Sequence, residues 1–258
     1  MTAQADGRAA IQQRTLRQDR WWLYPLVNVV GLGLFVAYGT YIAFANSNYW
    51  AKPYISPFYS PCFTNNCADD VYPHFVGWAH NLSPALLILW FPMFLRGTCY
   101  YYRKAYYRSF LLSPPACAVN EPRRRYSGER RFPLILQNSH RYWFYTTVVV
   151  AGFLTYDAAV AFIFPSGPGV GVGSMVLLVN AVLIWGYLGG CHSCRHILGG
   201  RLNHFSRHPV RYRLWSLAGR FNAKHDAWAW ASMIWIALAD VYIRLVAAGV
   251  FADPHWVA

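Results

Sequence analysis

The sequence predicts an all-α membrane protein, a bundle of five transmembrane helices, from its composition, its apolar runs and its distribution of charge. Of its 258 residues, 56% are hydrophobic and only 13% are charged, whereas soluble domains carry about 25% charged residues. Five apolar runs are each long enough to cross a hydrocarbon core, which takes about 20 helical residues. They cover residues 21–46, 75–95, 142–164, 173–198 and 227–250.

Lysine and arginine predict how the bundle is oriented. The chain divides into a basic N-terminal segment (1–20), a single bundle (21–252) and a short tail (253–258), and two basic loops, 96–141 and 195–226, interrupt the bundle. The N-terminal segment and these loops hold 21 of the 23 basic residues. Because such residues concentrate on the cytoplasmic side, we expect the N-terminus and both loops in the cytoplasm and the tail outside. The protein is then a multi-pass protein of the cell membrane.

The formal net charge of +13 does not predict binding to nucleic acid. The basic residues fall in blocks between apolar runs, and three of these blocks, 100–110, 123–131 and 204–215, combine basic with aromatic residues. Directly beneath membrane helices, this mixture is typical of aromatic belts and of binding to membrane lipids. The same surface is suited to docking a soluble subunit with an acidic face.

The predicted topology divides the six cysteines into two groups. Cys62 and Cys67 lie in the first outer loop, where an oxidising compartment favours a disulfide between them. The other four lie at or beyond the cytoplasmic ends of helices, where thiols stay reduced: Cys99, Cys117, Cys191 and Cys194.

The hexapeptide "CHSCRH" (191–196) places two cysteines and two histidines at the inner edge of the fourth span. On an intact helix Cys191 and Cys194 share one face, while His192 and His196 share another that is roughly opposite. One intact helix therefore cannot direct both pairs to one metal cluster. Either the segment unwinds at its flanking glycines, or other elements at the same depth complete the set. These elements offer Cys99, Cys117, His140 and His225.

Several chemistries suit this residue supply. Two thiolates with two imidazoles bind structural zinc or a Rieske-type [2Fe–2S] cluster. A haem held by His192 or His196 with His225 is the rival, and a helix end whose His and Arg complement the dipole and the headgroups is the simplest alternative. We prefer the Rieske-type cluster. Its preferred ligands are Cys191, Cys194, His196 and His225, with Cys99, His192, Cys117 and His140 as alternatives.

Ionisable residues within predicted spans are costly and mark either a functional site or an internal partner. They are His80, Asp157, Asp240 and Arg244. Asp240 and Arg244 are spaced i, i+4, which predicts a local ion pair that locks the bundle. The alternative is a proton route or a polar pocket for a lipid-soluble substrate.

The sequence shows no strand-like alternation, and we expect "GPGVGVG" (167–173) to form only an outer turn. It also lacks the GxGxxG, Walker A, HExxH and GxSxG motifs. With no obvious active site for a water-soluble metabolite, the chain has the pattern of a membrane anchor and electron conduit.

Three stretches carry a resemblance to a known family: "TCYYYRKAYYRSFLLSPPACAV" (98–119), "ILQNSHRYWFY" (135–145) and "CHSCRHILGGRLNHFSRHPVRYRLW" (191–215). The chain resembles the membrane-anchor (cytochrome b-type) subunit of actinobacterial succinate dehydrogenase, a five-helix single-chain anchor of respiratory complex II. The resemblance implies a flavoprotein subunit and an iron–sulfur subunit as cytoplasmic partners. It also implies that the chain works as an enzyme subunit that is not catalytic alone, passing electrons from succinate to menaquinone or ubiquinone.

The family pattern also bears on the cofactor. In the familiar five-helix anchors, histidines on four helices hold two haems b, but the run 21–46 contains no histidine, which favours the cysteine and histidine cluster. Candidate quinone-binding residues are His80, Asp240 and Arg244, with a pocket beside the cluster as the alternative. Other possible functions are a haem-bearing anchor of another quinone-linked oxidoreductase and a redox-inert transport or structural protein.

Overall fold

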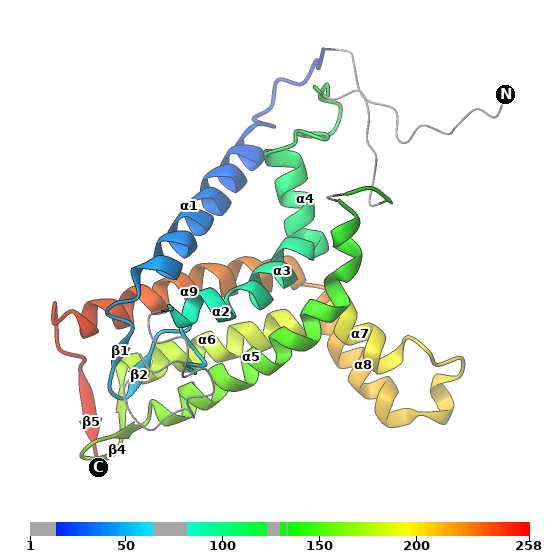
Figure 1. Cartoon of the computed structure of the whole chain (residues 1–258). Helices are drawn as coiled ribbons and strands as arrows, with labels where there is room; N and C mark the ends of the chain where they lie inside the picture. Colours follow the sequence, from blue (N-terminus) through cyan, green and yellow to red (C-terminus); the bar gives the residue numbers. More distant parts are fainter. Residues whose placement is uncertain (1–13, 64–81, 123–129, 133) are drawn as a thin grey trace.

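The structure is a computed structural model of the chain, and it describes residues 14–63, 82–122, 130–132 and 134–258. In this part of the chain, four helices are long and apolar enough to cross a membrane. Short strands gather at one end of these helices and three shorter helices at the other (Figure 1). The predicted all-α membrane fold is therefore confirmed.

Three of the long helices run side by side and form the body of the bundle. They are α5 (His140–Val160), α6 (Val172–Gly189) and α9 (His225–Ala247), and α6 packs against both others (Figure 1). The fourth, α1 (Leu23–Ala45), packs against α4 and is only 17% buried over its apolar window. An apolar helix so exposed is stable only in lipid or against another subunit.

The second predicted span, 75–95, lies partly outside the described residues. Its described part forms α2 (Pro84–Ile88) and α3 (Trp90–Thr98), which follow each other directly. Pro92 explains the break between them. It has no N–H to donate to the Ile88 carbonyl, and its ring clashes with that group. The chain then turns at Cys99 into α4 (Tyr100–Ser109).

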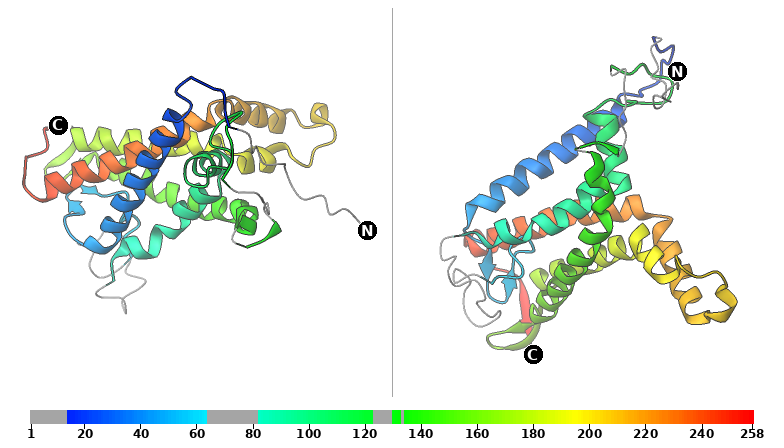
Figure 2. Two further views of the ribbon diagram at one scale, coloured as in Figure 1. Left: turned by 90° about the horizontal axis from the view of Figure 1, so that it is seen from above. Right: turned by 45° about the vertical axis from the view of Figure 1, so that its right-hand side comes forward.

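The fourth predicted span is too long, because the helix ends at Gly189 and not at residue 198. After Gly190 the chain becomes extended at Cys191, and a new helix, α7 (His192–Gly199), begins in another direction. The short η3 (Phe205–Arg207) leads to α8 (Pro209–Asn222), which packs against α7. Together α7 and α8 form an arm, residues 192–222, that projects from the bundle (Figure 2).

The opposite end, which we call the strand end, contains short strands that the sequence did not predict. Two hairpins form it: β1 (Trp50–Ala51) with β2 (Tyr54–Ile55), and β3 (Ile163–Phe164) with β4 (Gly167–Gly171). The C-terminal β5 (His255–Val257) pairs with β4. The expected outer turn at 167–173 is thus wrong, since most of it is the central strand of a sheet. Its glycines let the strands meet, because a Cβ on Gly169 would lie 2.4 Å from the Trp256 carbonyl.

The loop after α1 folds back into the bundle at the strand end. Residues 53–62 are buried throughout, and Ser56 and Ser60 donate hydrogen bonds to Asp240 of α9 and Asp157 of α5. Cys62 is disulfide-bonded, as expected, while its predicted partner Cys67 lies outside the described residues. This loop therefore closes the strand end as a plug.

Candidate functional site

The other end of the bundle, which we call the basic end, brings cysteines and histidines together at helix boundaries. Cys99 lies between α3 and α4, and Cys191 lies between α6 and α7; both have extended backbone, with ψ of 136° and 139°. His140 is the first residue of α5 and His225 the first of α9. The helix break at Cys191 frees its side chain from the face that it would share with Cys194 on a continuous helix.

These four residues form two thiol–imidazole contacts between different helices. The Cys99 Sγ lies 3.7 Å from the His225 Nε2, and the Cys191 Sγ lies 3.1 Å from the His140 Nε2. Both thiols are free and only 2% exposed, and His225 is 1% exposed. The group thus joins two buried thiols and the buried His225 to the partly buried His140, and thiols and imidazoles are the donor types that soft metals and iron–sulfur centres prefer.

A neighbouring hydroxyl orients His140. The Thr98 hydroxyl donates its proton to the Phe94 carbonyl at 2.7 Å, so it accepts from the His140 Nδ1, which lies 2.9 Å away. With its proton on Nδ1, the ring directs an Nε2 lone pair toward Cys191. Metal-ligating histidines are commonly fixed in this way by a partner on the other ring nitrogen.

Aromatic rings enclose His225. Tyr187 stacks on its ring at 4.9 Å between centroids, and Tyr101 packs edge-on at 5.2 Å. The His225 Nδ1 is buried and has no hydrogen-bond partner. A Cβ on Gly190 would lie 2.8 Å from this nitrogen, so Gly190 is the residue that gives the ring its space.

Burial also sets the protonation of the thiol at the helix break. It raises the pKa of Cys191 to about 11 and raises the pKa of Cys194 as well. Both are therefore protonated thiols at neutral pH, and binding of a metal at Cys191 must release its proton.

The remaining predicted ligands lie around this group or away from it. His192 is exposed, with its ring 6.4 Å from that of His225, and Cys194 packs against the core without a polar contact. His196 is exposed and faces Arg141. Cys117 is exposed in the segment after α4, where its carbonyl accepts a bond from Arg17. In the described part of the chain, no group of three or more His, Cys, Asp or Glu residues is placed to hold a single metal ion.

Two of the three predicted quinone-binding residues, Asp240 and Arg244, lie in the described part of the chain, where they contact each other. Asp240 is fully buried and is bonded by Tyr38, Ser56 and Arg244, so the expected ion pair with Arg244 is confirmed. Arg244 also donates to the Ser47 carbonyl at 2.6 Å. His80 lies outside the described residues.

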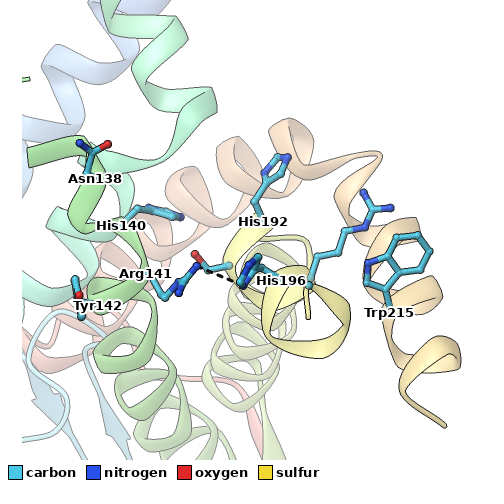
Figure 3. Close-up of a pocket in the computed structure, with 10 residues that line it drawn as sticks. Asn138, His140, Arg141, Tyr142, His192, His196 and Trp215 are labelled. Carbon is cyan, nitrogen blue, oxygen red and sulfur yellow. Dashed lines mark hydrogen bonds between the residues drawn. The ribbon is translucent and has the colours of Figure 1, made fainter. Parts of the chain in front are cut away.

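A cavity of about 670 Å³ lies at the basic end beside the cysteine and histidine group. Side chains from the start of α5 and from the arm face it (Figure 3). His140 belongs to both, since its ring contacts Cys191 and also lines the cavity.

The fold and the site together define a multi-pass helical membrane protein with two thiols and two imidazoles in contact at its basic end. Comparison with known proteins identifies the family: residues 23–249 match the actinobacterial succinate dehydrogenase subunit SdhC. The chain belongs to this family, and the resemblance stated from the sequence is confirmed. It is therefore a membrane subunit of an enzyme complex, succinate dehydrogenase, in the cell membrane.

A solved structure agrees with this assignment. A chain of the Mycobacterium smegmatis Sdh1 complex in the apo form is 48% identical, with a TM-score of 0.86. The match covers 98% of this chain and 97% of the other. A search of curated proteins found no match.

Proposed function

We propose that this chain carries electrons from the iron–sulfur subunit of succinate dehydrogenase to a quinone through a Rieske-type [2Fe–2S] cluster at the basic end. The proposed ligands are Cys99, Cys191, His140 and His225. The observation that carries the proposal is the pair of thiol–imidazole contacts between four helix boundaries, one buried and one partly buried. The proposal keeps Cys191 and His225 from the sequence prediction and takes Cys99 and His140 in place of Cys194 and His196.

The donor set supports a two-iron centre. A Rieske-type cluster takes two cysteines on one iron and two histidines on the other, so it needs four ligands spread over two ions. The two free thiols, the directed Nε2 of His140 and the unpartnered Nδ1 of His225 supply donors of these types. When bound, such a cluster accepts and donates one electron at a potential raised by its histidines.

The chain's own residues then hold and shield this centre. Thr98 fixes the ring of His140, and Tyr187 and Tyr101 keep water from His225. The Arg96 guanidinium lies 4.9 Å over the Tyr187 ring and is held by the Ala229 carbonyl and the Ser232 hydroxyl. Its positive charge favours an anionic, thiolate-ligated centre nearby.

The proposal also covers the orientation of the chain in the membrane and its partner subunits. We propose that the basic end faces the cytoplasm and that a fifth membrane crossing includes residues 84–98. The flavoprotein and iron–sulfur subunits then dock at the basic end. A quinone pocket that uses His80, Asp240 and Arg244 is a weaker proposal, because the described bonds of Asp240 and Arg244 are to the chain itself. Those bonds favour a structural role for the pair.

Low-temperature electron paramagnetic resonance on the purified, dithionite-reduced complex tests the cluster. We expect a Rieske-type signal in the wild-type complex, its loss in Cys99→Ser and Cys191→Ser, and its retention in the matched controls Cys194→Ser and Cys117→Ser. A haem signal in place of the Rieske signal would contradict the proposal. Loss of the signal in Cys194→Ser with retention in Cys99→Ser would restore the ligand set preferred from sequence.

A further inference from the structure

We propose that the cavity at the basic end binds the phosphate of an anionic phospholipid headgroup. The cavity has a volume of about 670 Å³ and lies between the start of α5 and the α7–α8 arm (Figure 3). This inference does not require the cluster proposed above, because it rests on Arg141 and Arg195 and on a different ligand; His140 is the one lining residue that the two proposals share.

The charge of the lining selects an anion. Arg141, Arg195 and three histidines line the cavity, and no aspartate or glutamate does. Within the described residues, neither guanidinium has an acidic partner. A neutral ligand such as a quinone does not need two guanidinium groups, whereas a phosphate takes several of their N–H donors at once.

One hydrogen-bond donor in this lining has no acceptor. The Arg195 guanidinium lies 4.3 Å over the Trp215 ring of α8, and its Nε is buried without a hydrogen-bond partner. A buried donor without an acceptor is unfavourable, and a phosphate oxygen in the cavity would satisfy it. The guanidinium is thus held in place by the ring before a ligand arrives.

The arm that carries Arg195 is itself fixed. Arg211 of α8 donates to the Leu198 carbonyl at 2.8 Å and to the Ile197 carbonyl at 3.2 Å, at the C-terminal end of α7. Gly199 allows close contact, since a Cβ there would lie 2.5 Å from the Trp215 ring. The cavity wall formed by the arm is therefore built into the fold.

The position of the cavity identifies the source of the phosphate as a lipid. It lies where the span α5 begins, and large apolar side chains lie exposed beside it: Tyr142 is 70% exposed and Ile197 is 41% exposed. Basic pockets at the cytoplasmic ends of membrane helices are typical sites for anionic headgroups, whose acyl chains need such adjacent apolar surface.

The experiment measures lipid bound to the whole complex. Three complexes are washed in detergent: the wild type, the cavity variant Arg141→Gln/Arg195→Gln and the control variant Arg201→Gln/Arg213→Gln. The control changes two exposed arginines of the arm that lie outside the cavity. Phospholipid classes are then counted by mass spectrometry. We expect the cavity variant alone to lose one anionic phospholipid per chain. Equal anionic lipid content in all three complexes overturns the proposal.

A second measurement distinguishes the ligands. The delipidated complex is titrated with phosphatidylglycerol, phosphatidylcholine or inorganic phosphate in separate samples, and its thermal unfolding temperature is measured at each concentration. We expect stabilisation by phosphatidylglycerol alone, with affinity roughly tenfold weaker for each arginine removed. Equal stabilisation by inorganic phosphate overturns the assignment to lipid. If the cavity variant has a raised KM for quinone and an unchanged lipid content, the cavity is assigned to quinone instead. If the double variant fails to assemble, Arg141→Gln, whose side chain is exposed, gives the same comparison.

Discussion

The two ends of the bundle bury different kinds of polar group. At the strand end, Asp240 is bonded by Tyr38, Ser56 and Arg244, and Asp253 is bonded by Tyr54 and Tyr242. At the basic end, two thiols contact two imidazoles, and the His225 Nδ1 has no partner. Carboxylates that accept several hydrogen bonds from their own chain stabilise a fold, whereas thiols and imidazoles in contact are donor types that metals and iron–sulfur centres take. The comparison teaches that burial alone does not mark a functional site.

Removing a proposed ligand should have the largest effect. His140→Ala and His225→Ala should reduce succinate-dependent quinone reduction by more than about 100-fold, because even outer-shell changes at metal sites cost about 10–100-fold. Succinate oxidation by an artificial soluble acceptor should persist in both, which shows that the complex is assembled. His192→Ala and His196→Ala are the matched controls. If they lose as much quinone reduction as the ligand variants, the division between the two sets is wrong.

Breaking the ion pair at the strand end should lower the thermal stability of the complex and leave quinone reduction unchanged. Asp240→Ala leaves Arg244, which is only 14% exposed, without its carboxylate, and loss of one partner of a buried pair costs about 3–5 kcal/mol. Thermal unfolding of the purified complex measures this loss. In complexes that survive purification, quinone reduction per enzyme should be unchanged. A raised KM for quinone at normal stability would instead make Asp240 part of a binding site.

The positioning role of Thr98 should appear as a smaller change at the basic end. Thr98→Val removes the hydroxyl that accepts from His140 but keeps the side-chain shape, so we expect the affinity of this site for its metal to fall by about 10-fold and the Rieske-type signal per complex to weaken. The resonance signal of the remaining centres should also shift, which a purely structural role would not produce. Thr98→Ser should restore both, and failure of this rescue would contradict the orienting role.

The smallest effect is expected from one hydroxyl at the strand end. Tyr54 donates to Asp253 at 2.6 Å, but Tyr242 and the Gly173 amide also bond this carboxylate. Tyr54→Phe should therefore lower the free energy of unfolding by only about 1 kcal/mol. Asp253→Asn, which weakens all three bonds, should cost more in the same thermal assay.

The sequence predicted the spans more reliably than their ends. Apolar runs located α1, α5 and α9 within a few residues, because run length and hydropathy determine which segments cross a membrane. The same criterion extended the fourth span through Cys191, since hydropathy does not record the break at Gly190. The plug loop was missed for a related reason: its burial depends on the serines that reach Asp240 and Asp157 from another part of the chain.

The candidate site was predicted in kind but not in detail. Depth along the helices indicated that Cys99, His140 and His225 reach the same level as Cys191. Helix periodicity, however, paired Cys191 with Cys194, a relation that holds only on a continuous helix. Which side chains meet depends on how α3, α5, α6 and α9 pack, and one sequence does not specify this.

The spread of the four residues along the chain has a consequence for biogenesis. Cys191 and His140 are 51 residues apart, and Cys99 and His225 are 126 residues apart. His225 begins α9, the last long helix among the described residues, so the contact with Cys99 can form only after that part of the chain has been made. A cofactor inserted at this place would therefore enter a bundle that already contains α3, α5, α6 and α9, and a truncated chain that lacks α9 could not complete the site.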